Sequence, residues 1–277
     1  MRIFRDPVKF QKWCRARKNA GARIALVPTM GYLHDGHLSL IAEAKRRKAD
    51  EIAVSVFVNP IQFGPNEDYE QYPRDEKADL AKCRTVGATA VFFPTPQTMY
   101  LPGHSVTVDE SVLSQGLCGA RRPGHFRGVC TVVAKLFNLS HADLAVFGQK
   151  DYQQAQIIRR MARDLNFDIE IVVAPIVREP SGLARSSRNT YLSDGERAAA
   201  QVLSRSLLAL KGLASPRPAK VVKAKIAAAV EKAGLRLDYV ECVDGETLQP
   251  VVRIARGTCV LVAAFAGKTR LIDNVVV

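Results

Sequence analysis

The stretch IALVPTMGYLHDGHLSL at residues 24–40 decides the fold of this chain. Its apolar run at 24–27 predicts a buried strand, and the apolar spacing from residue 38 onward predicts an amphipathic helix. A short glycine-bearing turn joins the two. A strand, such a turn and a helix start form a common phosphate-holding geometry, because backbone N–H groups and the positive end of the helix dipole face the anion.

Strands and helices alternate along the first two thirds of the chain. The expected strands are 24–27, 51–58, 89–93, 144–147 and 169–173, and the expected helices are 10–19, 38–48, 75–85, 129–139 and 152–165. This alternation predicts an α/β fold with a Rossmann-like, doubly wound parallel sheet. We also expect a short extra strand at 105–108 and a glycine- and arginine-rich loop at 117–128.

The pattern changes after Ala174-Pro175, where a polar loop at 177–188 begins. Two helices and a run of antiparallel strands are expected beyond it, at 194–213, 219–233, 237–243, 258–265 and 269–276. The sequence therefore predicts a first domain at 1–176 and a second, smaller α+β C-terminal domain at 177–277.

Composition narrows the class of partner. The 277 residues include 40 Lys and Arg against 27 Asp and Glu, and this net charge of +13 favours anionic ligands. No apolar run is long enough to span a bilayer, and the charged N-terminus lacks the apolar core of a signal peptide. Six scattered cysteines form no C-x-x-C pair, which favours free thiols in a reducing, cytoplasmic compartment.

Three polar turns, at 28–37, 59–68 and 148–151, each follow a predicted strand. In a doubly wound sheet ligands bind beyond the carboxyl ends of the strands, so we expect these turns to form the ligand site.

His34 and His37 have three candidate roles: metal ligands, phosphate contacts or surface residues. The H-E-x-x-H pattern of metalloproteases is absent, as are the Walker-type P-loop and the glycine-rich dinucleotide fingerprint. Because the pair opens a helix after a strand, with Gly36 between the two rings, phosphate contact is the favoured role.

Other polar residues have a functional and a plain interpretation. Lys150 and Asp151 suit a phosphate and a sugar hydroxyl, or simply a solvated lysine and a helix cap. The run 185–188 suits a phosphate clamp or a solvated hinge. Gln62 and Gln154 can each hydrogen-bond a hydroxyl or carboxylate, although exposed glutamine is normally uninformative.

Two further groups are ambiguous. Asp79, with Asp68, Asp75 and Glu76, offers carboxylates to Mg²⁺, although surface solvation explains most of them equally well. The basic loop at 121–127 suits nucleic acid, but it holds a single aromatic residue and so lacks a stacking platform.

Together these stretches resemble the pantothenate synthetase (pantoate–β-alanine ligase) family, within the nucleotidyltransferase superfamily that carries an HxGH signature. The matching motifs occur in the family's order: PTMGYLHDGH at 28–37, FVNPIQFGPNEDYEQYPRD at 57–75, RRPGHFRGV at 121–129, FGQKDYQQ at 147–154 and SSRNTYLS at 186–193.

The resemblance implies ATP-dependent condensation of pantoate with β-alanine through a pantoyl adenylate, with release of AMP and pyrophosphate. It also implies Mg²⁺, a homodimer with the segment from 105 onward as a candidate interface, and no nucleic-acid or membrane partner. The C-terminal domain is expected to close over the ATP site.

Residue roles carried over from the family follow the motifs. The ATP contacts implied are Met30, Gly31, Tyr32, Leu33, His34, Asp35, Gly36, His37, Gly148, Gln149, Lys150, Asp151, Val177, Arg185, Ser186, Ser187 and Arg188. His37 occupies the position of the family's proton donor. His34, Lys150 and Arg188 are expected to stabilise charge on the phosphates. Gln62 and Gln154 are implied to contact pantoate, with Gln62 also near β-alanine. The family resemblance assigns no Mg²⁺ ligand, and Asp79 is our candidate from the carboxylates named above.

Two positions depart from the family pattern. Arg185 stands where the family usually has methionine, and Ser181 where it usually has aspartate.

Two other functions compete with the ligase. A related nucleotidyltransferase would act on a phosphorylated acceptor. Gln62 and Gln154 argue against it, because arginine side chains would bind such an acceptor more naturally. A nucleic-acid-binding protein is supported only by the net charge and the loop at 121–127.

Overall fold

The computed structural model describes residues 1–65, 67–213 and 215–277. These residues form two compact units, one made of Met1–Gly148 and Gln154–Ala174 and the other of Gln149–Gln153 and Pro175–Val277. The second unit thus includes Gln149–Gln153, whereas the predicted boundary at 176/177 places this segment in the first domain. Asn66, in the polar loop predicted at 59–68, lies outside the described residues.

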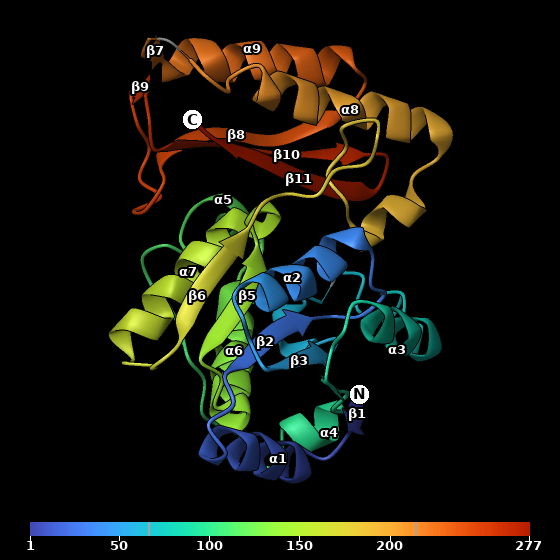
Figure 1. Cartoon of the computed structure of the whole chain (residues 1–277). Helices are drawn as coiled ribbons and strands as arrows, with labels where there is room; N and C mark the ends of the chain where they lie inside the picture. The colour runs from blue at the N-terminus through green and yellow to red at the C-terminus, as the bar shows by residue number, and fades with distance from the viewer. Residues whose placement is uncertain (66, 214) are drawn as a thin grey trace. The chain divides into compact units, whose positions relative to one another are not determined.

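The first unit is built on a six-stranded sheet in the order β1-β4-β3-β2-β5-β6, and every neighbouring pair is parallel (Figure 1). Its strands are β1 (Arg2–Phe4), β2 (Ile24–Thr29), β3 (Glu51–Val56), β4 (Ala90–Phe92), β5 (Leu144–Gly148) and β6 (Glu170–Ala174). The predicted fold class is confirmed. The edge strand β1 was not predicted, because three residues are too few to show a period.

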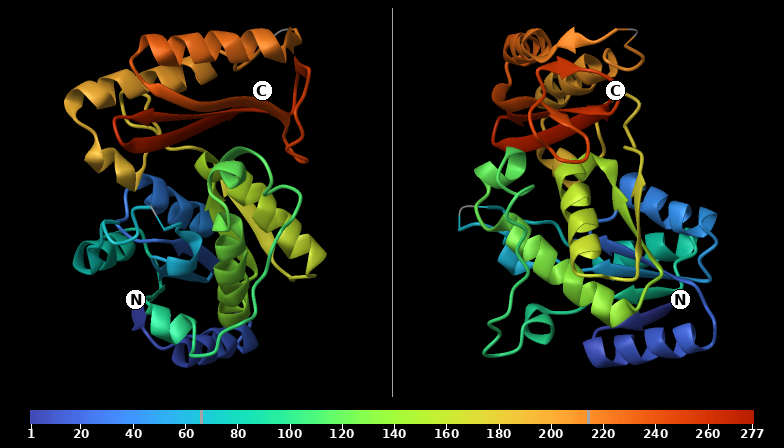
Figure 2. Two further views of the ribbon diagram at one scale, coloured as in Figure 1. Left: turned by 180° about the vertical axis from the view of Figure 1, so that it is seen from behind. Right: turned by 90° about the vertical axis from the view of Figure 1, so that its left-hand side faces the viewer.

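Helices cover both faces of this sheet. The helices of the first unit are α1 (Pro7–Asn19), α2 (Asp35–Arg46), α3 (Glu76–Thr85), α4 (Pro96–Met99), α5 (Leu117–Arg121), α6 (His125–Ser140) and α7 (Tyr152–Asp164). Helix α2 packs against β2, β3 and β5, whereas α1 and α6 pack against each other and against β2 from the opposite side (Figure 2). Residues 24–27 are therefore fully buried on both faces of the sheet, as their unbroken apolar run predicts.

Two local predictions are wrong. Residues 105–108 form no strand; Val106 is exposed, and the Val108 N–H donates to the Thr131 hydroxyl at 3.0 Å. The loop predicted at 117–128 contains α5, and α6 already begins at His125. Gly128, the last residue of that predicted loop, lies inside α6, where it allows close packing. A Cβ there would lie 2.3 Å from the Ile61 carbonyl oxygen.

The sheet reverses its direction of growth between β2 and β5. The chain adds β3 and then β4 on one side of β2, and later adds β5 and β6 on the other side. Leu26 of β2 pairs with Ala145 of β5, so the two strands end at the same edge of the sheet. Ligands bind at such a reversal in doubly wound folds, and the turn after β2 lies there.

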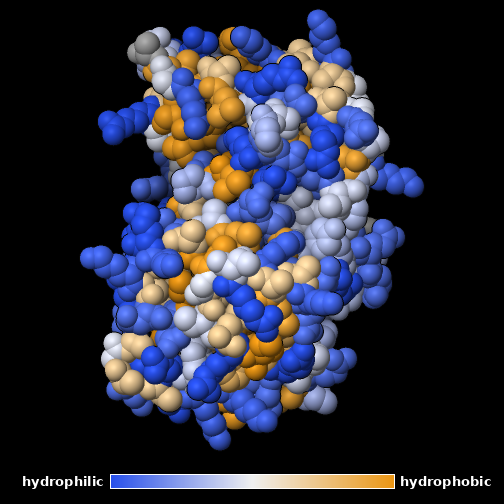
Figure 3. All heavy atoms as spheres, turned by 45° about the vertical axis from the view of Figure 1, so that its right-hand side comes forward, coloured by the Kyte–Doolittle hydropathy of each residue, from blue (hydrophilic) through white to orange (hydrophobic). Residues whose placement is uncertain are grey.

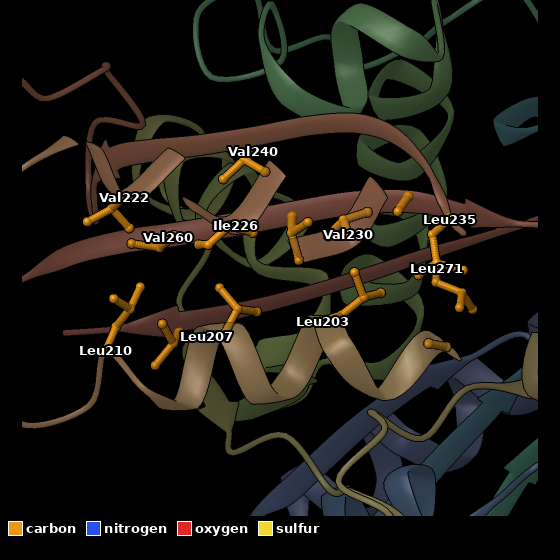
Figure 4. Packing of buried hydrophobic residues seen from close by; sticks show 14 of the residues in the cluster. Leu203, Leu207, Leu210, Val222, Ile226, Val230, Leu235, Val240, Val260 and Leu271 are labelled. Atoms are coloured by element: carbon orange, nitrogen blue, oxygen red, sulfur yellow. The ribbon is translucent and has the colours of Figure 1, made fainter. Parts of the chain in front are cut away.

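The second unit pairs two helices with a three-stranded antiparallel sheet in the order β11-β10-β8. Its elements are α8 (Asp194–Leu208), α9 (Ala219–Lys232), β8 (Arg236–Asp244), β10 (Thr258–Ala266) and β11 (Thr269–Val276), with a two-residue ladder of β7 (Arg217–Pro218) and β9 (Arg253–Ile254). Leu203, Ile226 and Val260 meet in its buried core (Figure 4). The predicted antiparallel strands are confirmed.

Hydrophilic side chains cover much of the face seen in Figure 3, with hydrophobic patches between them. Within the described parts of the chain, no helix combines the length and hydropathy that crossing a bilayer requires.

Candidate active site

The turn after β2 leads directly into a histidine-capped helix. Gly31 and Tyr32 both have positive φ angles, +87° and +51°, which reverse the chain between β2 and α2. His34 is the N-cap of α2: its Nδ1 accepts the Gly36 N–H at 3.1 Å. The His34 N–H donates in turn to Nδ1 of His37 at 3.3 Å, and the ring centroids lie 4.1 Å apart.

These two hydrogen bonds fix the protonation pattern of the pair. A ring nitrogen that accepts a hydrogen bond carries no proton, so each neutral ring holds its proton on Nε2. Both histidines thereby become N–H donors at the positive end of α2. Two such donors at a helix N-terminus suit an anion, and phosphate above all.

Asp79 anchors this turn from α3. Its carboxylate is 1% exposed and accepts the Tyr32 N–H at 2.9 Å and the Leu33 N–H at 2.7 Å. Burial raises the pKa of Asp79, and these two backbone hydrogen bonds only partly offset that rise. Lys82, one turn further along α3, donates to the Leu33 carbonyl at 2.6 Å. The turn is thus held by two side chains of a helix that begins about 40 residues later in the sequence.

Asp79, the candidate Mg²⁺ ligand, is engaged by the backbone of the turn. Residues 1–65, 67–213 and 215–277 contain no group of three or more His, Cys, Asp or Glu side chains that could hold a metal. Both oxygens of Asp79, the candidate ligand, accept backbone N–H groups. Asp75 caps α3 through the Ala78 N–H, and Glu76 pairs with Arg5. We therefore assign Asp79 a structural contact rather than a metal.

Gln62 lies in the short helix η1 (Pro60–Gln62), and its side chain is held in one orientation. Its Oε1 accepts from Nδ2 of Asn59 at 3.1 Å, and its Nε2 donates to the sulfur of Met30 at 3.1 Å. The Tyr100 hydroxyl donates to Oδ1 of Asn59 at 2.7 Å and so fixes the Asn59 amide as well. A thioether is a weak acceptor, so the Gln62 NH₂ group is well suited to donate to a stronger one, such as a carboxylate.

The remaining predicted residues divide between the units. Gln154 is half-buried in α7 of the first unit. In the second unit Lys150 lies in η2 (Gln149–Asp151), with its Nζ 3.7 Å from Asp151.

The loop at 177–188 is more ordered than the sequence suggests. Arg178 and Ala184 pair in an isolated antiparallel β-bridge, and the Arg185 N–H donates to the Val177 carbonyl at 2.9 Å. The helix η3 (Ser187–Tyr191) follows. Ser186 caps η3 by accepting the Arg188 N–H at 3.3 Å.

The residues that support the site were missed by sequence reasoning. Asn59 belongs to a motif that we quoted, yet nothing marked it as the partner of Gln62. Tyr100 lies 41 positions from Asn59, and Asn274 contacts η2 from 124 positions away. No local sequence pattern predicts contacts between residues so far apart in the chain.

Comparison with known proteins decides the family. The model of the family described as pantoate-beta-alanine ligase matches residues 2–276, nearly the whole chain. The chain belongs to the pantoate–β-alanine ligase family.

Members of the ligase family match the chain along its whole length. A pantothenate synthetase from Myxococcus xanthus is 54% identical over 277 residues, which cover 98% of this chain and 94% of that protein. The crystal structure of pantothenate synthetase from Thermus thermophilus has a TM-score of 0.88 at 42% identity, with 99% of both chains covered. A pantoate-beta-alanine ligase from Francisella tularensis, complexed with beta-gamma ATP and beta-alanine, has a TM-score of 0.81 at 32% identity and covers 100% of this chain and 97% of its own.

Proposed function

We propose that this chain condenses pantoate with β-alanine at the expense of ATP, in two steps. In the first, a carboxylate oxygen of pantoate attacks the α-phosphorus, an O–P bond forms, and the bond to the departing pyrophosphate breaks. In the second, the amine of β-alanine attacks the acyl carbon, the C–N bond forms, and AMP leaves with the acyl oxygen. The amine nitrogen loses one proton to water, and no covalent bond to the protein is needed.

The capped start of α2 is the observation that carries this proposal. The first step concentrates negative charge on a five-coordinate phosphorus and on the leaving pyrophosphate. His34 and His37, with their protons on Nε2, supply donors to that charge, since their Nδ1 atoms already accept backbone N–H groups. His37 is the residue that we assign as proton donor.

The fixed amide of Gln62 supports the pantoate assignment. The amide oxygen of Gln62 accepts from Asn59, so the side chain presents N–H donors to a ligand. Such donors can bind the carboxylate and hydroxyl oxygens of pantoate, whereas an ammonium group has no acceptor for them. Gln154 is proposed as the second pantoate contact. An acceptor substrate bearing a phosphate would call for a guanidinium at this position.

The second unit is proposed to contribute cationic contacts to ATP, from Lys150 and from Arg185 and Arg188. Gly148, Gln149, Asp151 and Val177 complete the proposed adenosine and phosphate contacts. Mg²⁺ would be held mainly by phosphate oxygens and water, as it commonly is with nucleotides. The absence of a cluster of donors in the described ranges supports this division.

We further propose a cytoplasmic homodimer. Leu101, Val106 and Val112 are 68%, 76% and 54% exposed, an unusual set of bare apolar side chains within one short segment. A second copy of the chain would cover them. Sedimentation equilibrium should give twice the mass of the chain, and a Val106→Asp variant should shift that equilibrium toward the monomer.

Release of AMP, with each substrate omitted in turn, tests the proposed reaction. Continuous turnover should require ATP, pantoate and β-alanine together. Steady AMP release without β-alanine would overturn the ligase assignment. A dinucleotide-like product from a phosphorylated acceptor would instead identify a related nucleotidyltransferase.

A further inference from the structure

Two adjacent polar residues, Asp273 and Asn274, are buried in the last strand of the second unit. They are 3% and 2% exposed, and their neighbours Leu271 and Val275 belong to the apolar core. Burying a charged and a polar side chain costs free energy unless both are fully hydrogen-bonded. Neither residue belongs to a motif that suggested function, so the partners that they bind are informative.

Asn274 binds the backbone of the segment that carries Lys150. Its Nδ2 donates to the Gln149 carbonyl at 2.9 Å and to the Lys150 carbonyl at 3.0 Å. Its Oδ1 accepts from Nε2 of Gln149 at 3.2 Å. Both ends of one buried amide are therefore used to fix η2 to strand β11.

Asp273 binds the segment that precedes Arg185–Arg188. Its carboxylate forms a bidentate pair with Arg178, with N–O distances of 2.6 and 2.9 Å. Arg178 also donates to the Gly182 carbonyl at 3.1 Å and bridges Ala184 through its backbone. Since the Asp273 carboxylate also accepts the Asn274 N–H at 2.8 Å, the two anchors are themselves connected.

We propose that Asp273 and Asn274 are positioning residues for ATP, which fix the Lys150 and the Arg185–Arg188 segments to one strand. The inference rests on the proposed contacts of Lys150 and Arg188 with phosphate. Because those segments lie about 35 residues apart in the sequence, independent motion would separate their cations. Adenylation depends on close placement of the reacting groups, and a displacement of about 1 Å can cost about 100-fold in rate.

Double-mutant cycles on the full-length enzyme test this proposal. We would measure kcat and the KM values for ATP and for pantoate in Asn274→Ala, Lys150→Ala and the double variant. Each single change should lower kcat/KM for ATP by about 10- to 100-fold, while KM for pantoate changes less than about twofold. If Asn274 acts through Lys150, the double variant should be no worse than Lys150→Ala alone.

A second cycle uses Asp273→Asn with Arg188→Ala, and it keeps the test decisive should Asn274→Ala not fold. Asp238→Asn is the matched control, because Asp238 forms an ion pair with Arg270 in the same sheet. It should lower the melting temperature without a selective change in KM for ATP.

Three outcomes separate the possibilities. Losses that multiply in both double variants, or a lower melting temperature with unchanged ATP kinetics, would overturn the positioning role. If Lys150→Ala and Arg188→Ala themselves leave kcat/KM for ATP unchanged, the proposed phosphate contacts fail and the positioning role falls with them.

Discussion

Two polar turns of this chain are held by opposite hydrogen-bonding chemistry. In the first unit, Asp79 accepts the N–H groups of Tyr32 and Leu33. In the second, Asn274 donates to the carbonyls of Gln149 and Lys150. Because Asp79 accepts backbone N–H groups of the first turn, those groups cannot donate to a ligand, and the two histidines offer side-chain donors instead. Because Asn274 donates to backbone carbonyls of the second turn, those oxygens are less able to repel an anion.

The largest effect is expected where the first turn depends on side-chain donors. His37→Ala should lower kcat by about 10²–10³, because one donor to the developing phosphate charge is lost. Loss of its part in the α2 cap should reduce the free energy of unfolding by only about 1 kcal/mol. A steady-state comparison and a urea titration separate the two effects. A small change in kcat with a large loss of stability would make His37 a structural residue only.

The next effect concerns the backbone of the turn. Gly31→Ala should cost about 2–3 kcal/mol, because φ is +87° and a Cβ would lie 2.9 Å from Val56 Cγ1 and 3.1 Å from Asp79 Oδ2. Gly148→Ala, at the end of the neighbouring strand, meets no atom within 4 Å and should change stability by less than about 1 kcal/mol. Urea unfolding of both variants measures the difference. Equal losses would contradict the strained geometry of the first turn.

The sequence identified the groups placed to touch a ligand better than the groups that hold them. His34, His37 and Gln62 follow strands or open helices, and that position is visible in the local pattern. Asp79 was noticed only as a possible metal ligand, because a carboxylate on a helix says nothing about which backbone it meets. Asn274 and Tyr100 act across more than 40 positions, where only the tertiary fold brings partners together.

A smaller effect distinguishes the two anchors by pH, since only Asp79 titrates. Burial raises its pKa in the folded state above the unfolded value of about 3.9. A raised pKa means that the folded protein binds the proton more tightly, so this contribution to stability is present at low pH and is lost as pH rises through the folded pKa.

The difference in unfolding free energy between the natural protein and Asp79→Asn should therefore decrease as pH rises above about 4 and then level off. Urea titrations across the acid range measure it. A difference that instead grows with pH would show that the backbone hydrogen bonds outweigh burial. The same comparison for Asn274→Ala should show no such slope.

The smallest effect is expected in the second unit, at Arg185, where the family resemblance implies a methionine. Arg185→Met should raise KM for ATP by about two- to fivefold, because one partly exposed positive charge beside the proposed phosphate contacts is lost. The kcat should change little, since neither the histidines nor Gln62 is touched. An unchanged KM would remove Arg185 from the phosphate contacts.

Pantoate-dependent exchange of labelled pyrophosphate into ATP tests the central claim most directly. If the first turn and the Lys150 segment both serve adenylation, the natural enzyme should exchange label with pantoate present and β-alanine absent. His37→Ala and Lys150→Ala should each reduce that exchange by about 10- to 1000-fold. Exchange that requires β-alanine, or that survives in both variants, would contradict the roles in adenylation proposed for His37 and Lys150.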